Sequence, residues 1–192
     1  MTQGRILAAG AIVGVAIVLS WLIFSALPRR YGAAPTKAVS AAPAAAAPAP
    51  PGRKIKARLF YVAEDGMHLT GVEREVAYGE GTVAQAREIV SSQIAPVPEP
   101  LVNAVPAGTG LRSLFVTDRG DAYVDLTREV VSSHTGGTDA ELLTVYTIVD
   151  ALTANLPAVR AVQILVEGKE VDTLAGHVDL RRPIEKNLEW IQ

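Results

Sequence analysis

One stretch near the C-terminal end constrains the fold more than any other, because residues 138–179 contain a complete helix followed by two strands. Apolar residues recur at helical spacing through its first half and form a wide stripe on one face. Thr138 and Glu141 have the spacing of a capping box at the start of this helix, and Pro157 ends it. The predicted stripe consists of Leu142, Leu143, Val145, Tyr146, Val149, Leu152 and Leu156.

The second half of this stretch has the alternation of a half-buried strand. Val162, Ile164 and Val166 alternate along it, as expected of a half-buried strand. Residues 168–169, a Gly-Lys pair, supply a turn, and the chain returns through Val171. We therefore predict a strand hairpin directly after the helix.

Two further hairpins are predicted upstream, each around a turn signal. Residues 56–63 form a strand, a Glu-Asp-Gly turn follows, and residues 67–76 pair back with Gly71 as a bulge or bend. Residues 111–117 and 122–126 form the second hairpin, joined by an Asp-Arg-Gly-Asp turn. The chain thus alternates strand pairs with helices.

A shorter helix is expected between these two hairpins. It opens at residues 81–82, where Thr82 and Gln85 again have capping-box spacing. Its predicted buried stripe consists of Val83, Ala86, Ile89 and Val90. A loop with Pro96, Pro98 and Pro100 follows, since proline fits neither a helix interior nor a central strand. The element order predicts an α+β fold in which two helices pack on one face of a mixed, mainly antiparallel sheet of strand hairpins.

An uncharged apolar run, Ile6–Leu27, precedes all of these elements. As a helix its 22 residues would span roughly 33 Å, enough for the hydrocarbon core of a bilayer. A cleaved signal peptide is the alternative, but its apolar region is normally shorter, at about 7–15 residues. We predict a retained single transmembrane helix, in which Gly10 and Gly14 have the spacing of a helix-pairing motif. Residues 33–51 are almost entirely Ala and Pro and predict an extended, semi-stiff spacer.

Two observations conflict over the side of the membrane on which the C-terminal part lies. Arg29, Arg30 and Lys37 follow the apolar run, whereas Arg5 alone precedes it, and the positive-inside rule would keep the C-terminal part in the cytoplasm. The Ala/Pro-rich linker is more typical of a domain displayed outside the membrane. We expect the outer location.

Charge and cysteine content exclude several classes of function. All 20 acidic residues but only 14 of the 18 basic residues lie after Gly52, so this part of the chain carries a formal charge of about −6. Such a domain is a poor partner for nucleic acid, whose phosphates need compensating Lys and Arg. The chain has no cysteine, which excludes disulfides, thiolate metal sites, cysteine nucleophiles and a lipidated-cysteine anchor.

The three histidines do not form a recognisable site. His68, His134 and His177 are scattered and lack the spacing that a metal site requires. Ser132 and Ser133 precede His134, but adjacent residues rarely supply a nucleophile and its base. We therefore predict no metal and no catalytic serine.

Carboxylates and a helix start supply the remaining candidates. Asp172 and Asp179 flank His177 and could support acid–base chemistry, although turn and edge roles are the simpler interpretation. Residues 136–138, Gly-Gly-Thr, could present backbone N–H groups to an anion, but the acidic residues that follow favour ordinary capping. The remaining acidic residues lack a calcium-loop spacing and are expected to be solvated; they are Glu73, Glu75, Glu80, Asp118, Asp121 and Asp125.

Four segments together, in order and at the right spacing, resemble the GerMN domain of sporulation and spore germination proteins. They are KARLFYVAEDG, NAVPAGTGLRSLFVTDRGDAYVDLT, GGTDAELLTVYTIVDALT and VQILVEGKEVDTLAGHVDLRRPIEKN, and they cover nearly all of residues 56–187. The resemblance implies an extracytoplasmic α+β domain, usually tethered by a lipoprotein or membrane anchor, without known enzymatic chemistry. It also implies a fold similar to the ring-building motifs of secretion and sporulation assemblies.

Anchor, linker and resemblance together predict three regions: residues 1–28 as cytoplasmic tip and transmembrane anchor, residues 29–53 as Ala/Pro-rich linker, and residues 54–192 as GerMN-like domain. We expect a non-catalytic domain without cofactor or metal, held by the Ile6–Leu27 helix, that contacts an envelope protein or wall polymer and does not bind nucleic acid. Two alternatives stay open: an envelope hydrolase using carboxylates near His177, and a ring-forming or homo-oligomeric subunit.

Overall fold

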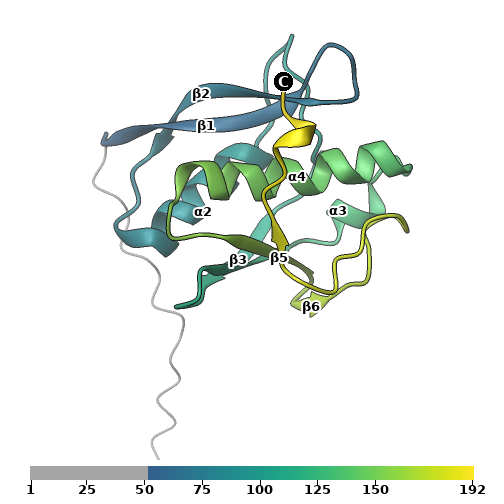
Figure 1. Ribbon diagram of the computed structural model, residues 1–192. Helices are drawn as coiled ribbons and strands as arrows, with labels where there is room; N and C mark the ends of the chain where they lie inside the picture. Colours follow the sequence, from purple (N-terminus) through teal and green to yellow (C-terminus); the bar gives the residue numbers. More distant parts are fainter. Residues whose placement is uncertain (1–51) are drawn as a thin grey trace, which may run out of the picture. The chain divides into compact units, whose positions relative to one another are not determined.

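The computed structural model describes residues 52–192, which form three layers (Figure 1). An antiparallel hairpin of β1 (Lys54–Val62) and β2 (Leu69–Ala77) forms one outer layer. The helices α2 (Gly81–Ile94) and α4 (Thr138–Asn155) form the middle layer, and a five-stranded sheet forms the third. The predicted membrane anchor and linker lie outside the described residues. Within residues 52–192, no helix combines the length and apolar character needed to cross a bilayer.

The five-stranded sheet is mixed, as predicted. Its order is β3 (Leu111–Val116), β4 (Asp121–Leu126), β5 (Ala161–Val166) and β6 (Lys169–Glu170), and β7 (Ile184–Glu185) also pairs with β5. Strands β4 and β5 run parallel, whereas the other pairs are antiparallel. The parallel pair follows from the connection, because the crossover from β4 to β5 contains α4. This crossover also contains the short helix α3 (Glu129–Ser132).

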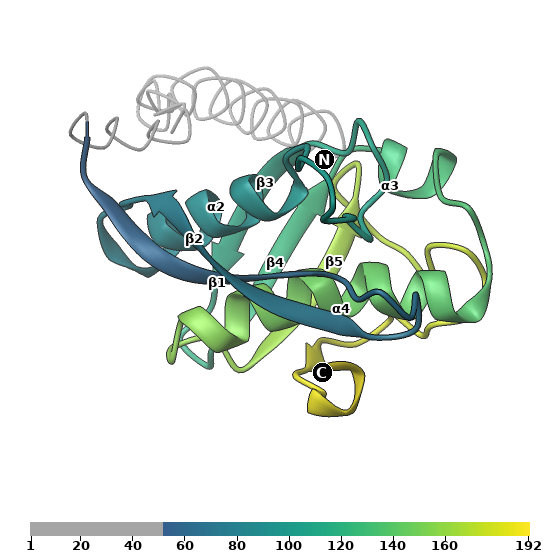
Figure 2. The same ribbon diagram turned by 90° about the horizontal axis from the view of Figure 1, so that it is seen from above.

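The predicted single sheet is wrong, because the first hairpin is separate. The outer edge of β1 is paired by side-chain amides of the two helices instead of by another strand. Asn155 of α4 exchanges two hydrogen bonds of 2.8 Å with the backbone of Arg58. Gln93 of α2 accepts from the N–H of Phe60 at 2.8 Å and donates to its carbonyl at 2.7 Å. The hairpin therefore lies on the helices, and the helices lie between two sheets (Figure 2).

Helix α4 is buried on most of its sides as a consequence. The predicted helix is confirmed, but its buried residues extend well beyond one stripe, since both outer layers cover it. They are Glu141, Leu143, Thr144, Val145, Thr147, Ile148, Val149, Asp150, Ala151 and Leu152. Strand β5 is likewise buried at Gln163 as well as at the predicted alternating positions.

Three local predictions about the first hairpin and α2 are wrong. The β1–β2 register is continuous through Gly71, which faces Phe60, so there is no bulge at this glycine; the Arg58 side chain occupies the space that a Cβ would fill. Val83 is exposed, and the buried face of α2 includes Gln85 and Gln93 in addition to the predicted Ala86, Ile89 and Val90. Residue Glu80, not Thr82, is the N-cap of α2, and no side chain in the described chain caps it.

The C-terminal segment crosses from the third layer to the first. After β6, which is only two residues long, the chain returns through β7 and a short 3-10 helix, η1 (Leu188–Trp190). Ile191 then forms a bridge with Leu69 of β2. The predicted final hairpin therefore exists but is short, and the end of the chain contacts all three layers.

Candidate functional site

A groove of about 510 Å³ opens beside the N-terminal end of α4. Its walls come from four separate segments: the end of β1, the loop after α2, the segment after α3, and the first turns of α4. We call it the α4 groove. Its lining mixes apolar and polar groups and includes Val62, Gly66, Asn103, Ala104, Val105, Pro106, Ala107, Ser133, His134, Thr135, Asp139, Ala140 and Leu143.

Hydrogen bonds of His134 hold two of these walls together. The N–H of Gly136 donates to Nδ1 at 3.0 Å, so the ring proton lies on Nε2, which is 3.2 Å from the hydroxyl of Thr144. That hydroxyl in turn contacts the carbonyl of Ala104 at 2.7 Å. Both ring nitrogens of His134 are thus engaged, and within residues 52–192 neither bonds the hydroxyl of Ser133. The imidazole therefore links two walls of the groove.

The start of α4 differs from the prediction. Gly137, at φ 92°, is the N-cap, and within the described part of the chain no side chain caps it, so the Thr138–Glu141 capping box is wrong. Glu141 is fully buried and accepts the N–H groups of Leu174 at 2.7 Å and of His177 at 2.8 Å. Burial raises its pKa, but backbone donors of residues 174–178 outweigh burial and lower the pKa overall. Glu141 therefore anchors a distant loop.

The carboxylates near His177 do not converge on a cavity. Asp179 pairs with Arg181 at 2.7 Å on the surface, and this guanidinium lowers the pKa of the Asp179 carboxyl. Asp172 bonds through its backbone carbonyl, which accepts from Leu180. Asp172, His177 and Asp179 are absent from the lining of the α4 groove. They are also absent from the lining of a second groove of about 500 Å³ near Arg160.

Three of the remaining ionisable candidates, His68, Glu73 and Glu75, are engaged in surface contacts. His68 lies 2.6 Å from Asp65, whose pKa is lowered to about 2 mainly by the backbone N–H of Met67 and by His68. Glu73 and Glu75 pair with Lys56 and Lys54 across the first hairpin. Residues 52–192 contain no cluster of three or more His, Asp or Glu side chains that could hold a metal ion.

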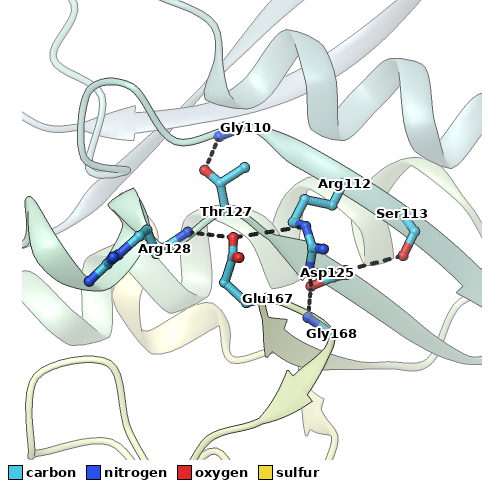
Figure 3. A network of polar contacts seen from close by, with 8 residues as sticks. All are labelled: Gly110, Arg112, Ser113, Asp125, Thr127, Arg128, Glu167 and Gly168. Atoms are coloured by element: carbon cyan, nitrogen blue, oxygen red, sulfur yellow. Dashed lines mark hydrogen bonds and ion pairs between the residues drawn. The ribbon is translucent and has the colours of Figure 1, made fainter.

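Asp125 contradicts the prediction of a solvated acidic residue, because it is buried at the centre of a polar network (Figure 3). Its carboxylate accepts the N–H of Gly168 at 2.7 Å and an N–H of Arg112 at 3.1 Å. Glu167 accepts the N–H of Arg128 at 3.3 Å and lies 3.8 Å from Arg112. Residues 167 and 168 both have positive φ, so the network fixes the tight turn between β5 and β6 onto β4.

The α4 groove has no signature in the sequence, because its walls are far apart in the chain. The loop at residues 103–107 follows Pro96, Pro98 and Pro100, and its sequence contains no motif that indicates a groove wall. Two large apolar side chains lie next to the groove lining in sequence: Met67 follows Gly66 and is 58% exposed, and Val102 precedes Asn103 and is 57% exposed. Exposed apolar residues beside a groove are a feature of contact surfaces.

Residues 58–172 match the Germane family, described as sporulation and spore germination. The chain belongs to this family. The match begins within β1 and ends just after β6, so the GerMN domain includes the hairpin, both main helices and most of the sheet. The predicted GerMN resemblance is confirmed.

Two solved structures are similar to this GerMN domain. One is a candidate lipoprotein from Clostridium perfringens, with 22% identity, a TM-score of 0.50, and coverage of 69% of this chain and 88% of the other. The other contains the tandem GerMN domains of the sporulation protein GerM from Bacillus subtilis, with 16% identity and a TM-score of 0.52. This second match covers 71% of this chain and 46% of the other. At these identities the likeness establishes the fold alone. No curated protein matches the chain.

Proposed function

We propose that this protein is a membrane-anchored, extracytoplasmic and non-catalytic GerMN protein, which acts by binding a protein or wall polymer of the cell envelope. The observation that carries the proposal is the α4 groove, with exposed Met67 and Val102 beside it. The lining of the groove combines apolar and polar residues, a composition suited to a partner segment. The candidate lipoprotein among the similar structures supports an envelope location.

The anchor in this proposal is the Ile6–Leu27 helix. A lipid-modified cysteine is excluded because the chain contains none. The Ala/Pro-rich linker would hold the domain away from the bilayer, at on the order of 3 Å per residue where it is extended. The hydrolase alternative gains no support, since Asp172, His177 and Asp179 lie outside both grooves.

The absence of cysteine makes the membrane side simple to test. A single cysteine is introduced at Val102, and intact cells are treated with a maleimide that cannot cross the membrane. We expect labelling before lysis, equal in extent to labelling after lysis. A control cysteine at Gln3, on the predicted cytoplasmic tip, should be labelled only after lysis. The opposite pattern would place the domain in the cytoplasm and overturn the proposal.

The groove itself is tested by filling it. Ala107 lines the α4 groove and is exposed, so Ala107→Trp should block a partner without disturbing the core. Ala154, exposed near the end of α4, provides a matched control as Ala154→Trp. Crosslinking in cells followed by capture of the protein should yield a discrete partner band with the wild type and with the control, but not with Ala107→Trp. Equal yields from all three would remove the groove from the proposal.

A further inference from the structure

The last nine residues form a strap across the side of the fold. Residues 184–192 begin at β7, which pairs with Ala161 and Val162 of β5 in the third layer. They pass α4, where Trp190 stacks on Tyr146 at a ring-centroid distance of 6.3 Å. They end at the first hairpin, where the N–H of Gln192 donates to the carbonyl of Leu69 at 2.9 Å. Figure 1 shows this course at the C-terminal end of the ribbon.

The strap is not itself part of the fully buried core, although Ile184 and Ile191 pack against the edge of the core. Its described side chains are half-buried or exposed. The bridge between Ile191 and Leu69 is a single residue pair, and the side chain of Gln192 reaches Asp65 at 2.7 Å on the surface. Segments with few buried contacts open at a lower free-energy cost than the core. We therefore expect the strap to open at a lower free-energy cost than the three layers.

A carboxyl group without a hydrogen-bond partner lies on α4, the helix that the strap crosses. Asp150 of α4 is 1% exposed, and among residues 52–192 neither of its carboxyl oxygens has a hydrogen-bond partner. The hydroxyl of Thr147, one turn earlier on α4, is buried and unpaired as well. Buried polar groups are nearly always satisfied, so this pair needs an explanation. From outside α4, the charge of Lys186 and the backbone N–H of Asn187 act on Asp150, and both belong to the strap; the Asn187 N–H acts through its dipole without completing a hydrogen bond.

We propose that residues 184–192 are a pH-sensitive strap, which closes over the neutral Asp150 carboxyl and is released as this carboxyl ionises. Burial is the main cause that raises the pKa of Asp150, to about 7, and the N–H of Asn187 and the charge of Lys186 oppose this rise. An ionised carboxylate at this position needs water. The other sides of α4 are covered by the first hairpin, α2 and the sheet, so water reaches Asp150 most easily when the strap lifts. In the described chain, Lys186 is the charged group that acts on Asp150.

The expected pH dependence follows from proton linkage. The closed state keeps its proton up to about pH 7, whereas in the open state the hydrated carboxyl loses it near the ordinary value of 3.8. Opening therefore becomes about tenfold more favourable per pH unit between roughly pH 4 and pH 7, and levels off above this range. Between pH 5 and pH 8 the change approaches on the order of a hundredfold.

Hydrogen exchange on the full chain, kept soluble with a mild detergent, tests the strap directly. Exchange rates are corrected for their intrinsic dependence on hydroxide. We expect the amides of residues 189–192 to lose at least tenfold in protection from pH 5 to pH 8, while amides of α2 and β4 keep theirs. Asp150→Asn should abolish this change, because the amide does not ionise. Asp118→Asn, at an exposed turn, should leave it intact.

Several results would overturn the proposal. One is strap protection that is constant with pH in the wild type. Another is an equal loss of protection in Asp150→Asn. If Asp150→Asn fails to fold, the wild-type measurement still decides: a loss confined to the strap supports the proposal, whereas a uniform loss across α2, β4 and the strap shows global destabilisation and contradicts it.

Discussion

Replacement of Glu141 by alanine should destabilise the domain strongly, although Glu141 belongs to the first turn of a helix and has no ion-pair partner among the described residues. Its carboxylate satisfies the N–H groups of Leu174 and His177, on a loop that follows it by more than 30 residues. The loop residue Leu174 and the loop's end at Leu180 are both buried. Loss of the carboxylate therefore removes the loop's main polar attachment to α4.

The magnitude follows from these contacts. Each buried N–H group that loses its acceptor costs roughly 1–3 kcal/mol, and hydrogen bonds to a charged acceptor lie at the upper end. Two such groups give an expected loss of about 3–5 kcal/mol for Glu141→Ala, a large share of the roughly 5–15 kcal/mol by which domains are stable. Glu141→Gln keeps one acceptor oxygen and should lose about half as much.

Urea unfolding of the 52–192 fragment, followed by circular dichroism, measures this difference. Asp139→Ala, in the same helical turn but exposed, is the matched control and should cost at most about 1 kcal/mol through the helix dipole. The lowered pKa also predicts a pH effect: Glu141 stabilises the fold above its unfolded value of 4.5, and this contribution disappears as pH falls through the folded pKa. Glu141→Gln should therefore reduce the loss of unfolding free energy at acidic pH. Equal stability of the alanine variants at positions 141 and 139 would refute the reasoning.

Three further predictions concern the core. Asp150→Asn should stabilise the domain at pH 7 by up to roughly 4 kcal/mol, because the wild type loses stability from about pH 4 to pH 7 as the carboxyl of its unfolded state loses its proton first. Urea titrations at about pH 5 and pH 7 measure the difference in unfolding free energy between variant and wild type, and an equal difference at both pH values would contradict the prediction. Gly79→Ala should cost at least about 2 kcal/mol of stability, since its Cβ would meet the backbone of Ala84. Gly71→Ala should cost under about 1 kcal/mol, since only the flexible Arg58 side chain must move, and similar thermal midpoints for the two variants would contradict this prediction. Gln93→Leu should cost about 2–4 kcal/mol by leaving the backbone of Phe60 unpaired, with exposed Ser91→Ala as a neutral control in the same unfolding assay.

Periodic patterns predicted the elements of this fold well, because periodicity reflects local geometry. The long helix, the first two hairpins and the buried strand residues Val162, Ile164 and Val166 are correctly predicted from spacing alone. The separate first hairpin was not, since its edge is satisfied by Gln93 and Asn155. A glutamine or asparagine inside a helix reads as solvent-facing unless the backbone that it pairs with is known.

The misassigned carboxylates have the same explanation. Glu141 lies at the spacing of a capping box, and Asp125 lies on the outward face of an alternating strand. Their real partners, the loop at residues 174–178 and the turn at Gly168, are more than 30 residues away in the chain. The α4 groove was missed for a related reason, because its four walls come together only when the layers are assembled.

Photocrosslinking in living cells tests the central claim most directly. A photoreactive phenylalanine analogue replaces Val102, beside the α4 groove, or Phe115, which is 60% exposed on β3 and lies outside the groove lining. The two positions match in exposure and apolar character. Binding through the groove predicts a discrete crosslinked envelope protein or glycan from position 102 and none from position 115. Crosslinks of equal yield from both positions, or none from position 102, would contradict a contact function for this groove.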